Sequence, residues 1–339
     1  EKDFHAHLPD RVFSTVFIGG GTPGILSDGQ IDQLCALIHA NGLRDDCEWT
    51  VEVAPNEINP QKLEAFLRGG VNRLSLGVQT LDPIFMKELG RKHDVTSALR
   101  AYKDVRSAGF ENVNIDLLFG APGQSLENWK DDLKKAVELD PNHISTYCLT
   151  FEEDTALYAK LAQGKITLDS DREAAFYEFA WDYLPSAGLN QYEVSNYAKE
   201  GYQCRHNLNT WRMHDWIGYG PSASSQYKKV RWKNYANIEQ WAKPLLLSTV
   251  QQYDEHTQLS EHELARDAIL FGLRMNDGLN LTKIGEQFGI ESTSFNRVYE
   301  FFKLLEIEKL ADRKKDTHFL TAEGRMRCDA IATEMPEFG

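Results

Sequence analysis

Three consecutive glycines close a short apolar run near the start of the 339-residue sequence. The run Val16–Ile18 is typical of a buried strand, and Gly19, Gly20 and Gly21 follow it directly. Glycines without Cβ atoms let a backbone approach a small molecule closely, and the next residue, Thr22, adds a hydroxyl. A plain strand-to-helix turn would explain one glycine more easily than three. The stretch therefore favours a ligand-binding turn.

Polar side chains also fall within or at the end of the next three predicted strands. Glu52 lies in one strand, Gln79 ends another, and Asp116 lies in a third. Polar groups in buried strands are costly unless they have partners. Each residue alone is explained as well by a structural hydrogen bond. Together with the glycine turn, they indicate a shared pocket.

Two further candidates come from loops and from an aromatic region. Arg91 follows a predicted helix and can grip a carboxylate with two hydrogen bonds, although loop arginines are usually just solvated. His206 lies among aromatic residues and glycines in the stretch Gln191–Tyr227, which suits a flat ligand but suits ordinary packing as well.

The elements that must position these residues alternate between strands and helices. Five strands are predicted, each followed by a helical pattern: Val16–Ile18, Trp49–Ala54, Arg73–Gln79, Val113–Phe119 and His143–Leu149. Such units give a parallel sheet, open or closed into a barrel, whose active face lies at the carboxyl ends of the strands.

The pattern changes after residue 150. Helices are predicted at Thr155–Gln163 and Arg172–Ala187, and a linker at Lys243–Ser260. Three helices and a hairpin then indicate a winged helix: Glu261–Met275, Leu281–Phe288, Ser292–Leu305 and Lys309–Thr321. Residues 261–339 carry 11 Lys plus Arg against 15 Asp plus Glu, a net charge of −4, so we expect a packing or partner domain rather than a DNA reader.

Composition narrows the class of protein. A net charge of −14 makes nucleic acid and anionic membranes poor partners, and no run approaches the roughly 18 apolar residues of a membrane span. The five cysteines are few, odd in number and widely separated, which predicts a reducing cytoplasm rather than a disulfide framework. The sequence starts with Glu1 rather than Met, so we expect that an upstream piece is absent.

Four motifs in order resemble radical S-adenosylmethionine (SAM) proteins of the HemN/HemW type. They are Phe17–Pro23, Val51–Pro55, Arg73–Gln79 and Asn114–Gly120. The stretch His206–Trp211 resembles the family motif His-Asn-x-x-Tyr-Trp, with Thr210 in place of the tyrosine. The resemblance implies a partial (β/α)6 TIM-like radical SAM barrel over residues 1–165, an extension over 166–245 and a winged-helix-like α+β domain over 246–339.

The resemblance also implies roles for individual residues. The SAM ammonium and ribose would be held by Gly20, Gly21 and Thr22 of the glycine turn and by the carboxylates of Glu52 and Asp116. The SAM carboxylate would be held by Gln79 and Arg91, the adenosyl group would lie beside Cys148, and haem would bind at His206. The family can hold more than one SAM molecule, and the sequence does not divide these residues between two.

The chain departs from the family at the iron–sulfur cluster. The resemblance implies a Cys-x-x-x-Cys-x-x-Cys motif for a 4Fe-4S cluster, and this sequence has none: Cys35 and Cys47 are twelve residues apart. We expect that the first barrel strand and the cluster loop are missing with an N-terminal piece. The strand Val16–Ile18 should then lie at an open sheet edge.

The resemblance implies a protein that binds haem and delivers it to an acceptor protein, using SAM and a 4Fe-4S cluster, with at most transient membrane contact. The alternative within the family is the oxidative decarboxylation of the porphyrin precursor coproporphyrinogen III, so the resemblance leaves open whether the chain is an enzyme. A third possibility is an unrelated barrel whose glycine turn binds a phosphate compound.

Overall fold

The computed structural model describes residues 12–21, 23–150, 159, 163 and 169–338. These residues form two compact units, which we describe separately. One comprises Phe13–His39 and Leu43–Gln203, and the other contains Ala40–Gly42 and the chain from Cys204 onward. The predicted helix over residues 155–163 and the predicted boundary after residue 165 lie almost entirely outside the described residues. The three-part domain division stays a prediction.

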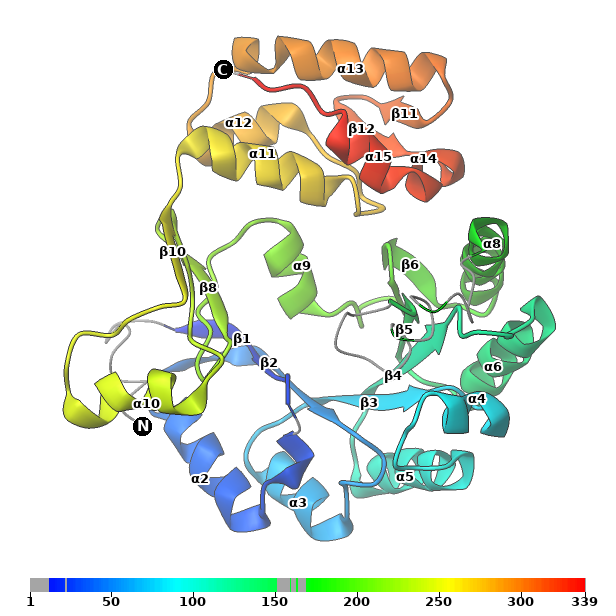
Figure 1. The fold of residues 1–339 in the computed structure, drawn as a ribbon, viewed down its shortest axis with the longest axis vertical. Helices are drawn as coiled ribbons and strands as arrows, with labels where there is room; N and C mark the ends of the chain where they lie inside the picture. The colour runs from blue at the N-terminus through cyan, green and yellow to red at the C-terminus, as the bar shows by residue number, and fades with distance from the viewer. Residues whose placement is uncertain (1–11, 22, 151–158, 160–162, 164–168, 339) are drawn as a thin grey trace. The chain divides into compact units, whose positions relative to one another are not determined.

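A curved sheet of seven strands organises the first unit (Figure 1). The strands are β1 (Phe13–Ile18), β2 (Leu43–Val53), β3 (Arg73–Gln79), β4 (Asn112–Phe119), β5 (His143–Cys148), β6 (Asn190–Glu193) and β7 (Asn196–Ala198). Their order is β1-β2-β3-β4-β5-β7-β6. The first five are parallel, and β7 pairs antiparallel with β5 and β6. The predicted partial barrel is confirmed, and the antiparallel pair extends it beyond the five predicted strands.

Strand β1 lies at one end of this sheet and pairs with β2 alone among the described residues. That position agrees with the expected sheet edge. Strand β2 begins at Leu43, six residues before the predicted Trp49, because Leu43 pairs with Phe13 of β1; a register shift then separates this pair from the pairing that resumes at Glu48.

Helices cover the convex side of the sheet. They are α2 (Asp28–His39), α3 (Pro60–Arg68), α4 (Pro83–Glu88), α5 (Val95–Ala108), α6 (Leu126–Glu138) and α8 (Ser170–Ser186), with a short 3-10 turn η1 (Pro23–Ile25). Side chains cap several of their N-termini: the Asn59 side chain accepts from Lys62 N, and Ser125 forms a capping box with Asn128. Each cap fixes where the chain turns back after a strand.

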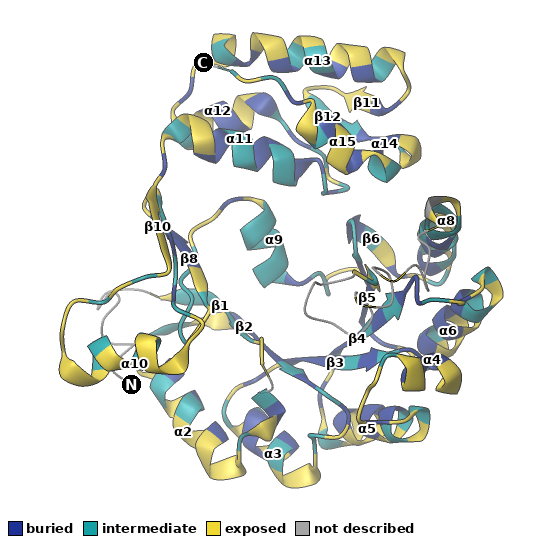
Figure 2. Cartoon of the chain, viewed as in Figure 1, coloured by how far each residue is buried: buried dark blue, intermediate teal, exposed yellow. Residues whose placement is uncertain are grey.

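Buried residues recur along the strands beneath these helices (Figure 2), and many of them are apolar. Leu74, Leu76, Ile115 and Leu117 are completely buried. The Phe119 ring lies 5.1 Å from that of Trp129 on α6. The residues between them point to the concave side, because successive strand residues face opposite sides of a sheet.

A second sheet opens the other unit. Helix α9 (Arg205–Trp211) precedes the strands β8 (Ser224–Tyr227), β9 (Val230–Lys233) and β10 (Glu255–Gln258), which pair antiparallel in the order β10-β9-β8. Helix α10 (Ile238–Leu247) lies between β9 and β10 in the chain. The prediction of a linker at Lys243–Ser260 is therefore wrong, because the end of α10 and the whole of β10 fall inside it.

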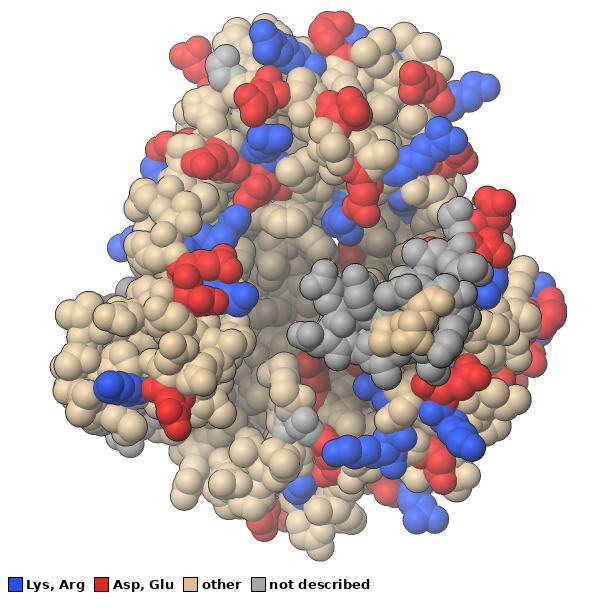
Figure 3. Space-filling model, viewed as in Figure 1, with Lys and Arg blue, Asp and Glu red and all other residues tan. Residues whose placement is uncertain are grey.

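The last part of the chain has three helices and a hairpin, as predicted. The elements are α11 (Glu261–Gly272), α12 (Leu281–Phe288), η2 (Ser292–Phe295), α13 (Asn296–Ile307), β11 (Ala311–Lys314), β12 (Thr317–Leu320), α14 (Ala322–Met326) and α15 (Cys328–Thr333). Phe295, Val298 and Phe302 lie in its apolar core. Acidic and basic side chains intermingle over its helices on the face in Figure 3. No described helix of the chain is long and apolar enough to cross a membrane.

Candidate functional site

Polar side chains form a row across the concave face of the first unit's sheet. Glu52 on β2 lies opposite Ser75 on β3, Ser75 opposite Asn114 on β4, and Asn114 opposite His143 on β5. Two residues further along β4, Asp116 lies opposite Ser145. Register therefore brings side chains from four strands onto one surface, as expected for a shared pocket.

Hydrogen bonds hold Asp116 in one orientation. Asn114 Nδ2 donates to Ser75 Oγ at 2.7 Å and to Asp116 Oδ1 at 2.8 Å. The Ser75 hydroxyl is 3.0 Å from Asp116 Oδ2 and donates to it. Both carboxylate oxygens thus have a donor within the sheet, and the side chain is fixed before any ligand binds.

A buried, neutral histidine, His143, helps to hold Asn114 in this arrangement. Burial lowers the pKa of His143 well below its usual value, and the charge of Arg73 lowers it further. Its Nδ1 lies 2.6 Å from Asn114 Oδ1 and its Nε2 lies 2.8 Å from the Tyr192 hydroxyl. A neutral ring that donates from Nδ1 and accepts at Nε2 satisfies both contacts.

The two carboxyl groups have raised pKa values. Burial raises the pKa of Glu52, and the nearby charge of Asp116 adds to that effect. Burial likewise raises the pKa of Asp116, while its hydrogen bonds with Ser75 and Asn114 lower it. The guanidinium of Arg73, itself buried, partly offsets both shifts. Such carboxyl groups favour a ligand that brings a positive charge or hydroxyl donors.

The glycine turn after β1 is built against Glu52. A Cβ atom on Gly19 would lie 2.5 Å from Glu52 Oε2, and the Gly20 N–H donates to the same oxygen at 3.2 Å. Gly20 and Gly21 have φ angles of 69° and 33°, which side-chain-bearing residues rarely adopt. Thr22 lies outside the described residues.

Gln79 ends β3 in a left-handed conformation, with φ of 74°, beside a register shift between β3 and β4. Such a conformation is uncommon for a residue with a side chain and marks positions that the surrounding structure determines. A Cβ on Gly77 would lie 2.9 Å from Gln79 Nε2, so glycine leaves room for this amide. Just beyond, Asp132 of α6 accepts from Thr80 Oγ1 at 2.5 Å and from Leu81 N at 2.9 Å.

Arg91 is exposed in the loop after α4, and no described residue forms a hydrogen bond or ion pair with its side chain. The loop is attached to the end of β3 through His93, whose Nε2 lies 3.2 Å from Val78 O. The structure brings the loop to this end of the sheet but does not bring the Arg91 guanidinium into contact with Gln79 or the carboxylates.

Cys148 ends β5 beside the loop after β4. A Cβ on Gly120 would lie 3.3 Å from Cys148 Sγ. Burial raises the pKa of this thiol to about 11, so it is un-ionised at neutral pH. The position suits an apolar contact with a ligand rather than nucleophilic chemistry.

His206 lies in the second unit, on α9, and is half-buried. Its backbone oxygen accepts from the Thr210 hydroxyl at 3.1 Å, so the threonine that departs from the family motif bonds within the helix. This residue and the polar row belong to different units, and we describe each by itself.

Sequence reasoning missed most of the polar row. Six of the omitted residues share the concave face of β3, β4 and β5, and the seventh, on β6, contacts His143 through its hydroxyl: Arg73, Ser75, Asn114, His143, Ser145, Tyr147 and Tyr192. The signal was the alternation in Arg-Leu-Ser-Leu, Asn-Val-Asn-Ile-Asp and His-Ile-Ser-Thr-Tyr, in which every second residue is polar.

The polar groups on the concave face of the first unit fit SAM. Carboxylates suit its ammonium and ribose hydroxyls, and the cradle left by Gly19 lies against one of them. The cysteines do not fit an iron–sulfur cluster. All five are free, and no three His, Cys, Asp or Glu side chains in the described chain are grouped to hold a metal ion.

Comparison with known proteins agrees with this fold. Residues 6–136 match the family profile of the Radical SAM superfamily. The solved structure of coproporphyrinogen III oxidase (HemN) from Escherichia coli, a radical SAM enzyme, superposes with a TM-score of 0.81, covering 98% of this chain and 80% of that one at 23% sequence identity. A likeness at that identity shows the fold, which is that of a radical SAM half-barrel.

Relatives found by sequence comparison share a higher identity with this chain than that structure does. Heme chaperone HemW of Bacillus subtilis (strain 168) is 32% identical over 278 residues, which cover 81% of this chain and 73% of the relative. Heme chaperone HemW of Escherichia coli (strain K12) is 41% identical over 219 residues, or 64% of this chain and 57% of the relative. The chain belongs to the HemW-like branch of the radical SAM family.

Proposed function

We propose that this protein binds haem and delivers it to an acceptor protein, and that its half-barrel binds SAM. The observation that carries the proposal is the 32% identity to a protein named heme chaperone over 81% of this chain. The likeness to the oxidase, at 23% identity, concerns the fold and adds no support for oxidative decarboxylation.

The polar row supplies the SAM site in this proposal. The carbonyls of Gly20 and Gly21 and the carboxylate of Glu52 accept from the SAM ammonium, and Asp116 accepts from ribose hydroxyls. The raised pKa values of Glu52 and Asp116 suit this role, because a bound cation or hydroxyl donor compensates a buried carboxylate.

The remaining contacts lie around this centre. The Gln79 amide and the Arg91 guanidinium hold the SAM carboxylate, Thr22 contributes its hydroxyl, and Cys148 packs beside the adenosyl group. Arg91 would have to turn inward, since no described residue holds it. Bound SAM would supply a reactive sulfonium carbon–sulfur bond, and the residues of this chain orient it.

Haem binds at His206 in this proposal, through an imidazole that can ligate iron. The acceptor is a protein that takes haem, and contact with a membrane is at most transient. Five free cysteines favour a reducing compartment such as the cytoplasm.

Haem titration of the full chain, followed by the Soret band, tests the proposal. We expect saturable binding by the wild type and weaker binding by His206→Ala. His256→Ala is the matched control, because His256 is an exposed histidine of the same unit that stacks on Tyr253, with ring centroids 5.7 Å apart. Equal affinity in His206→Ala and His256→Ala would remove the role of His206, and a wild type without saturable binding would refute the function.

A further inference from the structure

A buried arginine lies beside the polar row, and the proposed SAM contacts do not include it. Arg73 begins β3, and only 2% of its surface is exposed. Within the described chain, its side chain makes one hydrogen bond, from Nη1 to Thr50 Oγ1 at 3.5 Å, and its Nε has no partner. No carboxylate of the described residues forms an ion pair with its guanidinium.

The strand register places Arg73 one step below the two carboxylates of the site. Its neighbour Thr50 on β2 comes two residues before Glu52. On its own strand, Ser75, which donates to Asp116, comes two residues after it. Residues two apart on a strand share one face and lie roughly 7 Å apart. Arg73 therefore lies on the concave face, on the strand between those that carry Glu52 and Asp116.

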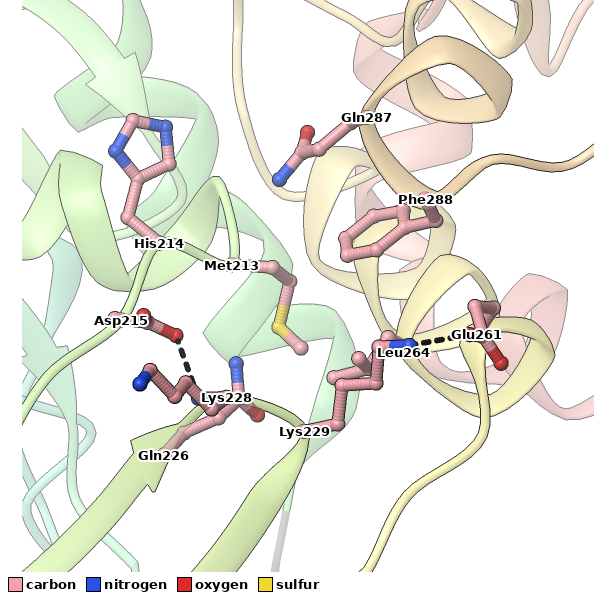
Figure 4. Close-up of a pocket in the computed structure, with 10 residues that line it drawn as sticks. All are labelled: Met213, His214, Asp215, Gln226, Lys228, Lys229, Glu261, Leu264, Gln287 and Phe288. Carbon is pink, nitrogen blue, oxygen red and sulfur yellow. Dashed lines mark hydrogen bonds and ion pairs between the residues drawn. The ribbon is translucent and has the colours of Figure 1, made fainter.

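The lysines of a pocket in the second unit are placed differently. Lys228 and Lys229 line a cavity of about 590 Å³, and both are exposed. Figure 4 shows the ion pair of Lys229 with Glu261, and the Asp215 carboxylate that accepts from the Lys228 backbone N–H. Water and carboxylates compensate those charges. A buried guanidinium without an ion pair needs other compensation, because removing a charge from water is costly.

Two carboxyl groups on the concave face respond to this buried charge. Burial raises the pKa of Glu52 and of Asp116, and the charge of Arg73 lowers both. Burial lowers the pKa of His143, and Arg73 lowers it further. The guanidinium thus favours two ionised carboxylates and a neutral imidazole. The titratable groups around it and around these carboxylates are Glu48, Glu52, Asp116, His143, Tyr147 and Glu193.

The charges of this face match those of SAM. Ionised Glu52 and Asp116 together with Arg73 leave one negative charge. The sulfonium, ammonium and carboxylate of SAM leave one positive charge. Without the guanidinium, two like charges would share one buried surface, and such a pair tends to hold a proton. A carboxyl group that holds a proton loses the charge that attracts the SAM ammonium.

We infer that Arg73 is a positioning residue of the SAM site, whose buried charge keeps Glu52 and Asp116 ionised and ready to accept from SAM. The inference rests on the proposed function, because it assumes that SAM binds on this face. Arg73 acts through the two carboxylates and does not touch the ligand.

Calorimetric titration of SAM into the full chain from pH 5 to pH 7 tests this role, because the SAM amino group stays mainly protonated over this range. Arg73→Met keeps much of the side-chain volume and removes the charge. The ratio of wild-type to Arg73→Met affinity should grow about tenfold as the pH falls from 7 to 5, since the carboxyl groups of the variant take up protons at a higher pH. Arg73→Lys keeps the charge and should restore most of the affinity at pH 5.

Arg44→Met is the matched control, because Arg44 is an exposed arginine of β2 that pairs with Asp46. It should bind SAM like the wild type at every pH. A ratio of wild-type to Arg73→Met affinity that does not change with pH would overturn the inference, because a merely structural role lowers affinity equally across the range.

Proton counting on the wild type keeps the inference testable if Arg73→Met folds poorly. Binding enthalpies in two buffers of different ionisation enthalpy give the number of protons released when SAM binds. We expect a value close to zero at pH 7, and release of about one proton per chain would overturn the inference. No saturable SAM binding by the wild type would instead refute the SAM site of the proposed function, and this inference with it.

Discussion

Replacing Asp132 by asparagine should change how the stability of the half-barrel depends on pH. Asp132 is completely buried on α6, and its two oxygens accept from Thr80 and Leu81, the residues directly after Gln79. Burial raises the pKa of this carboxyl group from 3.8 to about 6, against the smaller opposing effect of its hydrogen bonds. The side chain therefore fixes the end of β3 but is costly to ionise there.

The direction of this pH dependence follows from how tightly the folded and unfolded chains bind the proton. Because the folded chain holds this proton more tightly than the unfolded chain, the wild type is most stable below about pH 4 with respect to this group. It loses that stability as the pH rises to about 6 and above. A difference of about two pKa units corresponds to about 3 kcal/mol at neutral pH.

Asparagine keeps the geometry and removes the ionisation. Its oxygen still accepts from Leu81 N–H, and its amide can donate to the Thr80 oxygen. The free energy of unfolding of Asp132→Asn, measured by urea denaturation from pH 4 to pH 7, should exceed that of the wild type by an amount that grows by about 2 kcal/mol across this range. Asp132→Ala, which removes both acceptors, should destabilise the fold throughout.

Parallel stability curves for wild type and Asp132→Asn would refute this reasoning, because they would mean that the Asp132 pKa is the same in folded and unfolded chains. A curve for Asp132→Asn that lies below the wild type at pH 7 would show that the charge itself stabilises the loop.

Three other substitutions test the sites through binding and stability. Gly19→Ala places a Cβ against the Glu52 carboxylate, so calorimetry should show SAM affinity reduced about tenfold, whereas Gly29→Ala, with open space around its Cβ, should leave SAM binding unchanged. Asn114→Ala removes donors to Asp116 and leaves His143 without its acceptor, which should lower the free energy of unfolding by about 1–3 kcal/mol and weaken SAM binding in the same titration. Lys228→Asn/Lys229→Gly should raise the thermal unfolding midpoint, because each lysine in the left-handed region costs about 1–2 kcal/mol. The ion pair lost with Lys229 contributes less than that. A lower midpoint would contradict the proposed backbone strain.

The order of elements was predictable because hydrophobic periodicity and caps are local. The strand at Arg73–Gln79 and the helix at Leu281–Phe288 agree with the predicted bounds to the residue. The strand β10 was not predictable in the same way. All four of its residues are polar and exposed, and only pairing with β9 makes them a strand.

The candidate site was predictable in part for a related reason. Glu52 and Asp116 stand out as charges in apolar runs, but Asn114, Ser75 and His143 acquire meaning only when register places them beside those charges. The left-handed backbone of Gln79 likewise depends on the register shift between β3 and β4 and on the loop that Asp132 holds. Neither the register shift nor the position of this loop can be predicted from sequence spacing.

The central claim is that the concave polar face of the half-barrel binds SAM, and calorimetric titration of SAM into wild type and Asp116→Asn tests it most directly. Asp46→Asn is the control, because Asp46 is an exposed aspartate of the same unit, 2.9 Å from Arg44. The account predicts that Asp116→Asn weakens SAM binding about tenfold or more while Asp46→Asn binds like the wild type. Identical isotherms for all three proteins would contradict it.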